Sequence, residues 1–138
     1  MRFLTAAFTF STMLTIIAMA GTPADACTGN QPIYLAAFEK ADVLVAGRIS
    51  NYRLHGTAIA KFDVLIEDVL IGNPPQTVSA TWVNPNMALP ESMPAGLFLV
   101  PLVQGTTSLA VLQPPCAPSY ILASNSQEAV EIRRRLHH

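Results

Sequence analysis

Apolar and polar residues alternate with a period of two through the middle of the chain. Four apolar residues face one way there and three charged residues face the other: Ala60, Phe62, Val64 and Ile66 against Lys61, Asp63 and Glu67. Successive side chains of a strand point to opposite faces, so this pattern predicts an antiparallel strand with one buried face. Turn residues at 72–75 end it, and Val78, Ala80 and Trp82 repeat the period in a second strand.

Three further segments complete the predicted sheet. Residues 42–49 are apolar and rich in β-formers, and the segments 97–103 and 108–112 flank a turn at 104–107 that predicts a hairpin. Five strands at this spacing indicate a small barrel or sandwich. Pro101 has no N–H to give to a ladder, so we expect its strand to be bulged or to lie at an edge.

Helical patterns stand at both ends of the sheet region. Residues 33–40 place three apolar side chains on one face, and Asn125 with Glu128 has the spacing of an N-cap and its returning carboxylate ahead of a second helix. Arginines at 133–135 suit the negative end of that helix, where we expect a solvated terminus rather than a binding patch. The proline-rich segment 84–96 predicts a loop.

The N-terminus has the anatomy of a secretory signal peptide. Arg2 precedes an uncharged apolar run from 3 to 20, Pro23 breaks the run, and Ala24 and Ala26 are the small residues before a cleavage site. We therefore expect residues 1–26 to be removed and the protein to be secreted, periplasmic or held in the cell envelope. Cleavage after Ala20, lipoprotein processing and a single spanning helix are the less favoured alternatives.

Composition limits the number of domains and the kinds of partner that we expect. The remaining 112 residues, 27–138, make one domain with seven Lys and Arg against eight Asp and Glu. This near-neutral charge does not favour binding of nucleic acid or an anionic membrane, and we expect a monomer. Cys27 and Cys116 are an even pair in an exported chain, which predicts one disulfide.

Catalytic chemistry has weak support in the sequence. His55 is the one histidine away from the C-terminus, and no nucleophile elbow accompanies it. Glu67 and Asp68 point to opposite faces of a strand and do not form a carboxylate pair. We expect a protein that is not an enzyme, with no cofactor and no metal of its own.

The sequence contains two candidate ligand-binding surfaces for such a barrel. Trp82, Tyr52 and Tyr120 would be aromatic platforms for a ligand, although Trp82 shares its strand face with apolar residues and core packing is favoured for it. Met87, Leu89 and Met93 would form an exposed apolar surface or a cap on the barrel end, and the cap is favoured.

The order of several short motifs carries a resemblance. An N-terminal Cys-Thr, a short helix, "ADVLVAGRI", a strand ending in "VLIGNPP", "AGLFLVPLV" and "LAVLQPPCAPSYILAS" before a closing helix span nearly the whole mature chain. In this order they resemble the netrin-like module of the tissue inhibitors of metalloproteinases and their bacterial relatives. The resemblance implies a mostly β fold, a five-stranded OB-type antiparallel barrel with a short N-terminal helix and a C-terminal helix.

The resemblance also implies a mode of action. In that family the amine and carbonyl oxygen of the first mature residue chelate the catalytic zinc of a protease, so Cys27 would supply both atoms and Thr28 would enter the adjoining specificity pocket. A Cys27–Cys116 disulfide would hold the terminus still. The chain departs from the animal inhibitors at position 29, where Gly replaces their second cysteine, and Cys116 resembles the partner of that second cysteine.

These observations favour an exported protein-interaction domain whose partner is a zinc metalloprotease or another extracytoplasmic protein. The alternative is a secreted or envelope accessory OB-fold domain that binds a protein or carbohydrate ligand without inhibiting a protease.

Overall fold

The computed structural model describes residues 32–85 and 87–138, so the expected signal peptide, Cys27 and Thr28 lie outside the described residues. The elements in chain order are α1 (Leu35–Phe38), β1 (Val43–His55), β2 (Ile59–Ile71), β3 (Thr77–Val83), β4 (Phe98–Gln104), β5 (Leu109–Val111), β6 (Leu122–Ala123) and α2 (Gln127–Leu136).

The first five strands close into a barrel. Their order is β1-β2-β3-β5-β4, and β4 pairs back onto β1 over Val43 to Gly47. All pairings are antiparallel except that of β3 with β5, which is parallel. This is the predicted mostly β, OB-fold-like barrel with a short N-terminal helix and a C-terminal helix. The hairpin between the segments 97–103 and 108–112 is confirmed, with the Gly105 N–H donating to the Ser108 carbonyl at 2.8 Å.

One strand was not expected from the sequence. The two-residue β6 pairs with the start of β4, where Phe98 lies opposite Ala123 and Leu99 opposite Leu122. A segment of two residues is too short to show a period of two, so no pattern could indicate it. The strand leads directly into α2 and brings that helix to the barrel wall.

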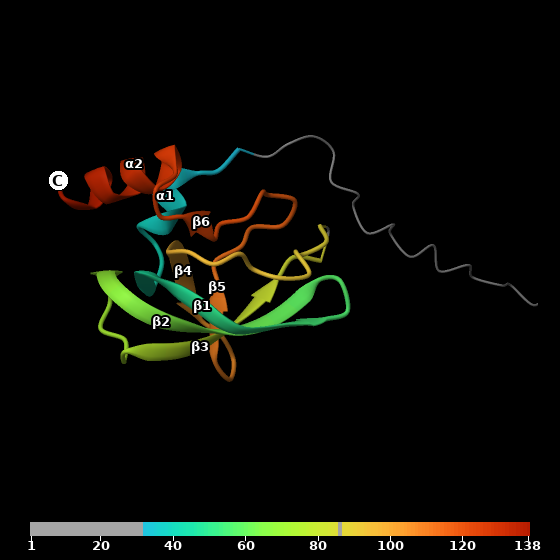
Figure 1. Ribbon diagram of the computed structural model, residues 1–138. Helices are drawn as coiled ribbons and strands as arrows, with labels where there is room; N and C mark the ends of the chain where they lie inside the picture. The colour runs from blue at the N-terminus through green and yellow to red at the C-terminus, as the bar shows by residue number, and fades with distance from the viewer. Residues whose placement is uncertain (1–31, 86) are drawn as a thin grey trace, which may run out of the picture.

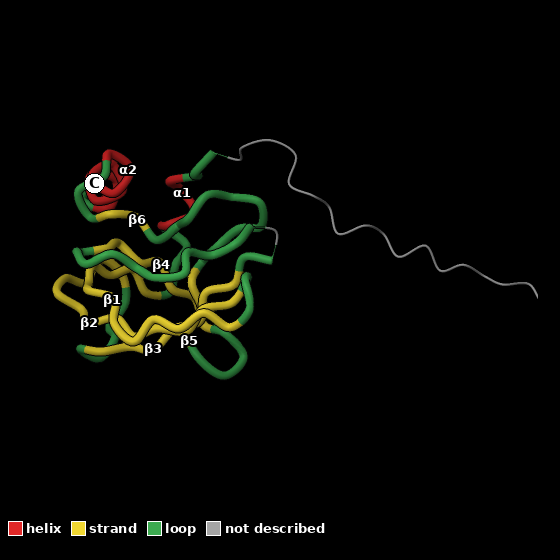
Figure 2. Tube along the Cα trace, turned by 45° about the vertical axis from the view of Figure 1, so that its right-hand side comes forward, coloured by secondary structure: helices red, strands yellow, loops and turns green. Residues whose placement is uncertain are grey.

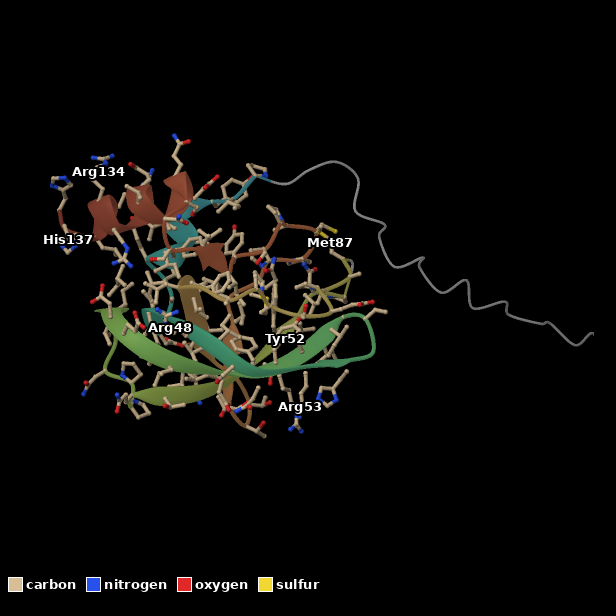
Figure 3. All side chains as sticks on the ribbon, viewed as in Figure 1. Arg48, Tyr52, Arg53, Met87, Arg134 and His137 are labelled. Carbon is tan, nitrogen blue, oxygen red and sulfur yellow. The ribbon has the colours of Figure 1, made fainter. Side chains whose placement is uncertain are left out.

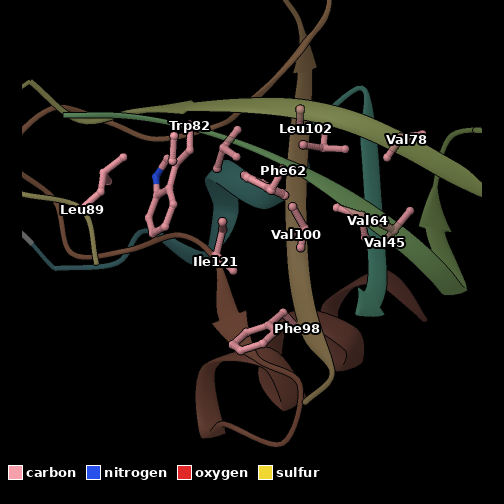
Figure 4. Close-up of a cluster of buried hydrophobic side chains, with 13 residues drawn as sticks. Val45, Phe62, Val64, Val78, Trp82, Leu89, Phe98, Val100, Leu102 and Ile121 are labelled. Carbon is pink, nitrogen blue, oxygen red and sulfur yellow. The ribbon is translucent and has the colours of Figure 1, made fainter. Parts of the chain in front are cut away.

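The two helices lie on one side of the barrel, and β2 and β3 form the opposite side (Figure 1, Figure 2). Two apolar clusters follow from this layout. The first fills the barrel and contains alternate residues of β2 and β3, including Phe62, Val78 and Trp82 (Figure 4). The outer faces of β2 and β3 are not covered by helices, which is why these strands alternate in sequence.

The second cluster lies between the barrel wall and the helices. Leu44 of β1 and Leu99 of β4 belong to it, whereas their neighbours Val45 and Val100 belong to the barrel interior. The paired parts of β1 and β4 are therefore buried on both faces. This explains why their sequences are unbroken apolar runs rather than alternating ones.

The expectation for Pro101 was wrong. β4 lies inside the sheet, between β1 on one side and β5 and β6 on the other, and its register with β1 runs without a bulge from Phe98 to Leu102. The Pro101 carbonyl accepts the Leu112 N–H at 2.9 Å, so the proline nitrogen faces the same side. The missing N–H thus falls where the pairing of β4 passes from β6 to β5, and it costs one ladder bond there.

The start of α2 is one residue later than the capping pattern predicted. Ser126, not Asn125, is the N-cap, and its hydroxyl accepts the Ala129 N–H at 3.2 Å. A serine and an asparagine side by side both satisfy the N-cap preference, and only the backbone path decides between them.

The arginines at the end of α2 are all paired. Arg133 contacts Asp68 of β2 at 2.9 Å and also donates to the Ser124 hydroxyl at 3.2 Å, which ties the helix to the barrel. Arg134 and Arg135 contact Glu131 of the same helix at 2.6 and 3.5 Å. This agrees with the prediction that the segment is a helix terminus and not a binding patch.

Candidate functional site

Of the predicted site residues, Cys116 lies in the described part of the chain, in the loop between β5 and β6, residues 112–121, which we call the Cys116 loop. Cys116 is half-buried there, has a left-handed backbone with φ of 59°, and is not a free thiol. Cys27 and Thr28 lie outside the described residues, so the Cys27–Cys116 bridge stays a prediction. What the structure adds is the way in which the Cys116 loop is held.

A single amide side chain, that of Gln113, organises the Cys116 loop. Its Oε1 accepts the Trp82 indole N–H at 3.1 Å and the Tyr120 backbone N–H at 3.0 Å. Its Nε2 lies within donating distance of three carbonyls of the loop, those of Pro114 at 3.2 Å, Ala117 at 3.3 Å and Pro118 at 3.0 Å. The prolines among these residues cannot donate backbone hydrogen bonds, so the Gln113 amide takes the place of a backbone ladder.

The described start of the chain is attached to the same loop. The Tyr34 backbone N–H donates to the Tyr120 hydroxyl at 3.1 Å, and the rings of Phe38 and Tyr120 stack with centroids 5.0 Å apart. Tyr34 is seven positions after Cys27, and a chain of seven steps can span at most about 25 Å when fully extended. Since Tyr34 is fixed four residues from Cys116 along the loop, a bridge between the two cysteines is within reach of the chain.

Asn84 is a polar residue buried beneath the Cys116 loop, and no local sequence pattern predicted its burial. Its side chain is 3 % exposed, and its Nδ2 donates to the Ala117 carbonyl at 3.4 Å. Its Oδ1 has no hydrogen-bond partner among the described residues. A buried acceptor without a donor costs about 1–3 kcal/mol.

Two exposed apolar side chains flank the Cys116 loop. Tyr34 is 59 % exposed beside Tyr120, and Met87 is 43 % exposed, with its N–H donating to the Asn84 carbonyl at 3.2 Å (Figure 3). Leu89, by contrast, is buried and Met93 packs against the barrel cluster. The prediction that the proline-rich loop caps the barrel end is therefore confirmed for Leu89 and Met93, while Met87 remains on the surface.

The aromatic platforms considered from the sequence do not exist on the surface. Trp82 is 2 % exposed and Tyr120 is fully buried, so neither ring can stack on an external ligand. Tyr52 is half-buried, stacks on Phe62 and donates its hydroxyl to the Pro90 carbonyl at 2.7 Å. Burial raises the pKa of the Tyr52 hydroxyl. The expectation that Trp82 packs in the core is confirmed.

The other residues with possible chemistry are dispersed. His55 is exposed at the end of β1, and the carboxylates of Glu67 and Asp68 pair with separate arginines, Arg48 and Arg133, at 2.8 and 2.9 Å. Within residues 32–85 and 87–138, no three His, Cys, Asp or Glu side chains lie close enough together to hold a metal ion. In the same part of the chain, no helix has the length and apolar character needed to cross a membrane.

Neither the available protein-family models nor the curated protein sequences give a match to this chain.

Proposed function

We propose that this chain is an exported, non-catalytic protein-interaction domain that acts through the edge formed by its mature N-terminus and the Cys116 loop. The observation that carries the proposal is the Gln113 network, in which one amide holds Trp82, Tyr120 and three loop carbonyls. A loop fixed in this way loses little conformational entropy when a partner binds.

The surface around the loop suits a protein partner. Tyr34 and Met87 are exposed side chains of the kinds enriched at protein interfaces. Among the described residues, no charged side chain takes part in the hydrogen bonds that hold the loop. Recognition at this edge would rest on shape and apolar contact rather than on a long-range field.

The partner that we propose is a zinc metalloprotease. With residues 1–26 removed, the amine and carbonyl oxygen of Cys27 would enter the open coordination position of the protease zinc, and Thr28 would fill the neighbouring pocket. An α-amino group has a pKa near 8, so its neutral, ligating form is accessible close to neutral pH. The zinc belongs to the partner, and the chain needs no metal of its own.

The test compares two N-termini of the purified mature protein against a panel of zinc metalloproteases with a fluorogenic peptide substrate. Protein that begins at Cys27 should inhibit at least one enzyme, and the same protein with one added Ala before Cys27 should inhibit it at least about 100-fold less, because the amine is moved off the metal. Equal inhibition by both forms would reject zinc chelation. A matched form with Ala added after His138 controls for the extension itself.

The alternative function, an accessory domain that does not inhibit a protease, predicts a different result with the same purified proteins. No metalloprotease would be inhibited by either form, yet a photo-crosslinker placed at Met87 would capture one envelope or secreted protein. The same crosslinker at Val130, an apolar residue on α2 that is 57 % exposed against 43 % for Met87, serves as the control position. Capture from both positions alike would leave the edge without a special role.

A further inference from the structure

A polar depression of about 580 Å³ lies on the outer face of β1, β2 and β3, away from the Cys116 loop. Figure 3 shows Arg53 pointing out of the barrel on the side opposite to the two helices. The lining side chains that matter below are Asn51, Arg53, Lys61, Asp63, Thr81 and Ser108.

The strand register sets these side chains in rows. Arg53 of β1 lies opposite Lys61 of β2, and Lys61 lies opposite Thr81 of β3. The β1 register shifts between Ser50 and Arg53, where Asn51 adopts φ of 54°. This bulge brings the Asn51 amide onto Asp63, in the next row of the same face.

The row of Arg53 and Lys61 places two like charges directly opposite each other on neighbouring strands. Like charges directly opposite each other across two strands destabilise a sheet. Neither side chain makes an ion pair or a hydrogen bond to any residue in the described part of the chain. The arginines of α2 are all paired, whereas Arg53 and Lys61 have donors free for a ligand.

The one carboxylate in the depression does not neutralise the row by an ion pair. Asp63 accepts from the Asn51 amide at 2.8 Å through Oδ2 and from the Ser79 hydroxyl at 2.5 Å through Oδ1. These two hydrogen bonds, with the nearby charge of Arg53, lower the pKa of Asp63. The charged groups facing the depression are thus Arg53, Lys61 and ionised Asp63, with His55 as a further titratable group at its rim.

The remaining lining selects the kind of anion. Hydroxyls of Ser79, Thr81 and Ser108 line the depression around the row, and the ring of Phe62 beneath them is only 2 % exposed. Hydroxyl and amide groups suit a ligand rich in hydroxyl groups, and the volume is in the range of small-molecule sites.

We propose that this depression binds a phosphorylated sugar, with the phosphate between Arg53 and Lys61 and the sugar hydroxyls against Ser79, Thr81 and Ser108. The anion removes the repulsion between the two cations and forms charge-assisted hydrogen bonds with both. The site does not involve the N-terminal edge and stands independently of the function proposed for that edge.

The experiment is isothermal titration of the exported mature protein at about 50 mM salt, where exposed charges are weakly screened. The probes are glucose 6-phosphate, glucose, inorganic phosphate and a hexaglutamate peptide. Glucose 6-phosphate should bind saturably, and in a parallel NMR titration it should shift amide signals of β1, β2, β3 and the turn at Ser108. Glucose and phosphate should each bind at least about tenfold more weakly, a difference of about 1.4 kcal/mol.

Arg53→Gln combined with Lys61→Gln should abolish this binding, while Lys40→Gln, an exposed lysine beside α1, should leave it unchanged. Thermal unfolding of each variant checks that the fold is kept. The proposal would be overturned if the double variant kept its affinity for glucose 6-phosphate, or if inorganic phosphate bound with equal affinity. It would also be overturned if the peptide bound more tightly than the sugar phosphate, or if the binding of glucose 6-phosphate did not saturate.

Discussion

The Cys116 loop and the depression on β1, β2 and β3 differ in whether their polar side chains find partners within the domain. In the loop, one uncharged side chain, Gln113, uses its acceptor and its donors on partners within the domain. In the depression, Arg53 and Lys61 keep their donors unused within the described residues. The hydrogen bonds of Gln113 fix the shape of the loop, whereas the donors of Arg53 and Lys61 are left free for the ligand that we propose.

Arginines elsewhere show that this difference is not one of residue type. Arg133 is as long and as charged as Arg53, but it spans from α2 to Asp68 and Ser124 and stabilises the contact between helix and barrel. What separates the two arginines is the neighbour that the fold supplies. Arg133 makes an ion pair with Asp68, whereas Arg53 lies near Asp63 without making an ion pair in the described part of the chain.

The largest expected effect concerns the tether of the loop. Cys116→Ser should lower the free energy of unfolding of the mature protein by about 4 kcal/mol, because a bridge to Cys27 would close a loop of about 90 residues. Guanidinium unfolding followed by the fluorescence of Trp82, the single tryptophan, measures it. Adding reductant should reproduce the loss in the unmodified protein and change nothing in the variant; an unmoved midpoint would argue against the bridge.

The next effect concerns the shape of the loop itself. Gln113→Ala should cost about 3 kcal/mol, since the Trp82 and Tyr120 N–H groups lose their acceptor and three carbonyls lose a donor. The same unfolding measurement applies. Gln104→Ala, at an exposed glutamine whose side chain makes no hydrogen bond within the described residues, should stay within about 0.5 kcal/mol. Similar losses in both variants would contradict the assigned role of Gln113.

The two kinds of arginine should respond to different extents. Arg133→Gln removes an ion pair and a hydrogen bond and should destabilise by about 0.5–1 kcal/mol. Arg53→Gln removes a repulsion from Lys61 and also an attraction to Asp63, so in the absence of ligand it should change the free energy of unfolding less than Arg133→Gln does. Urea unfolding at low salt resolves the difference, and raising the salt should shrink it. A loss of stability in Arg53→Gln as large as that in Arg133→Gln would show that its donors already serve the fold.

The smallest effect is a dependence on pH in the depression. Hydrogen bonds from Asn51 and Ser79 lower the pKa of Asp63 in the folded state, so its contribution to stability is present above the unfolded pKa of about 3.9 and is lost as pH falls through the folded pKa. Asn51→Ala should move the Asp63 titration, followed by carboxyl NMR, back toward its ordinary range. An unchanged titration would mean that the Asn51 bond is not made in solution.

Alternation along β2 and β3 was enough to predict their buried and exposed faces, because each strand has one wet side and a period of two is then unavoidable. The hairpin around 104–107, the loop at 84–96 and the first helix were equally readable from local chemistry. These are short-range features, and the residues that decide them are neighbours in sequence.

The candidate sites depended on contacts that no local pattern carries. Gln113 meets Trp82 across 31 positions, Tyr34 meets Tyr120 across 86, and Arg53 faces Lys61 only because β1 and β2 pair in one register after a bulge. Pro101 is likewise tolerated inside the sheet because it lies between the part of β4 that pairs with β6 and the part that pairs with β5. The sequence by itself determined which faces are apolar, since that follows from the spacing of side chains along the backbone. Only closure of the barrel decided which polar groups satisfy one another and which remain open, because hydrogen bonds and charge pairs act over a few ångströms and distant segments must first be brought within that range.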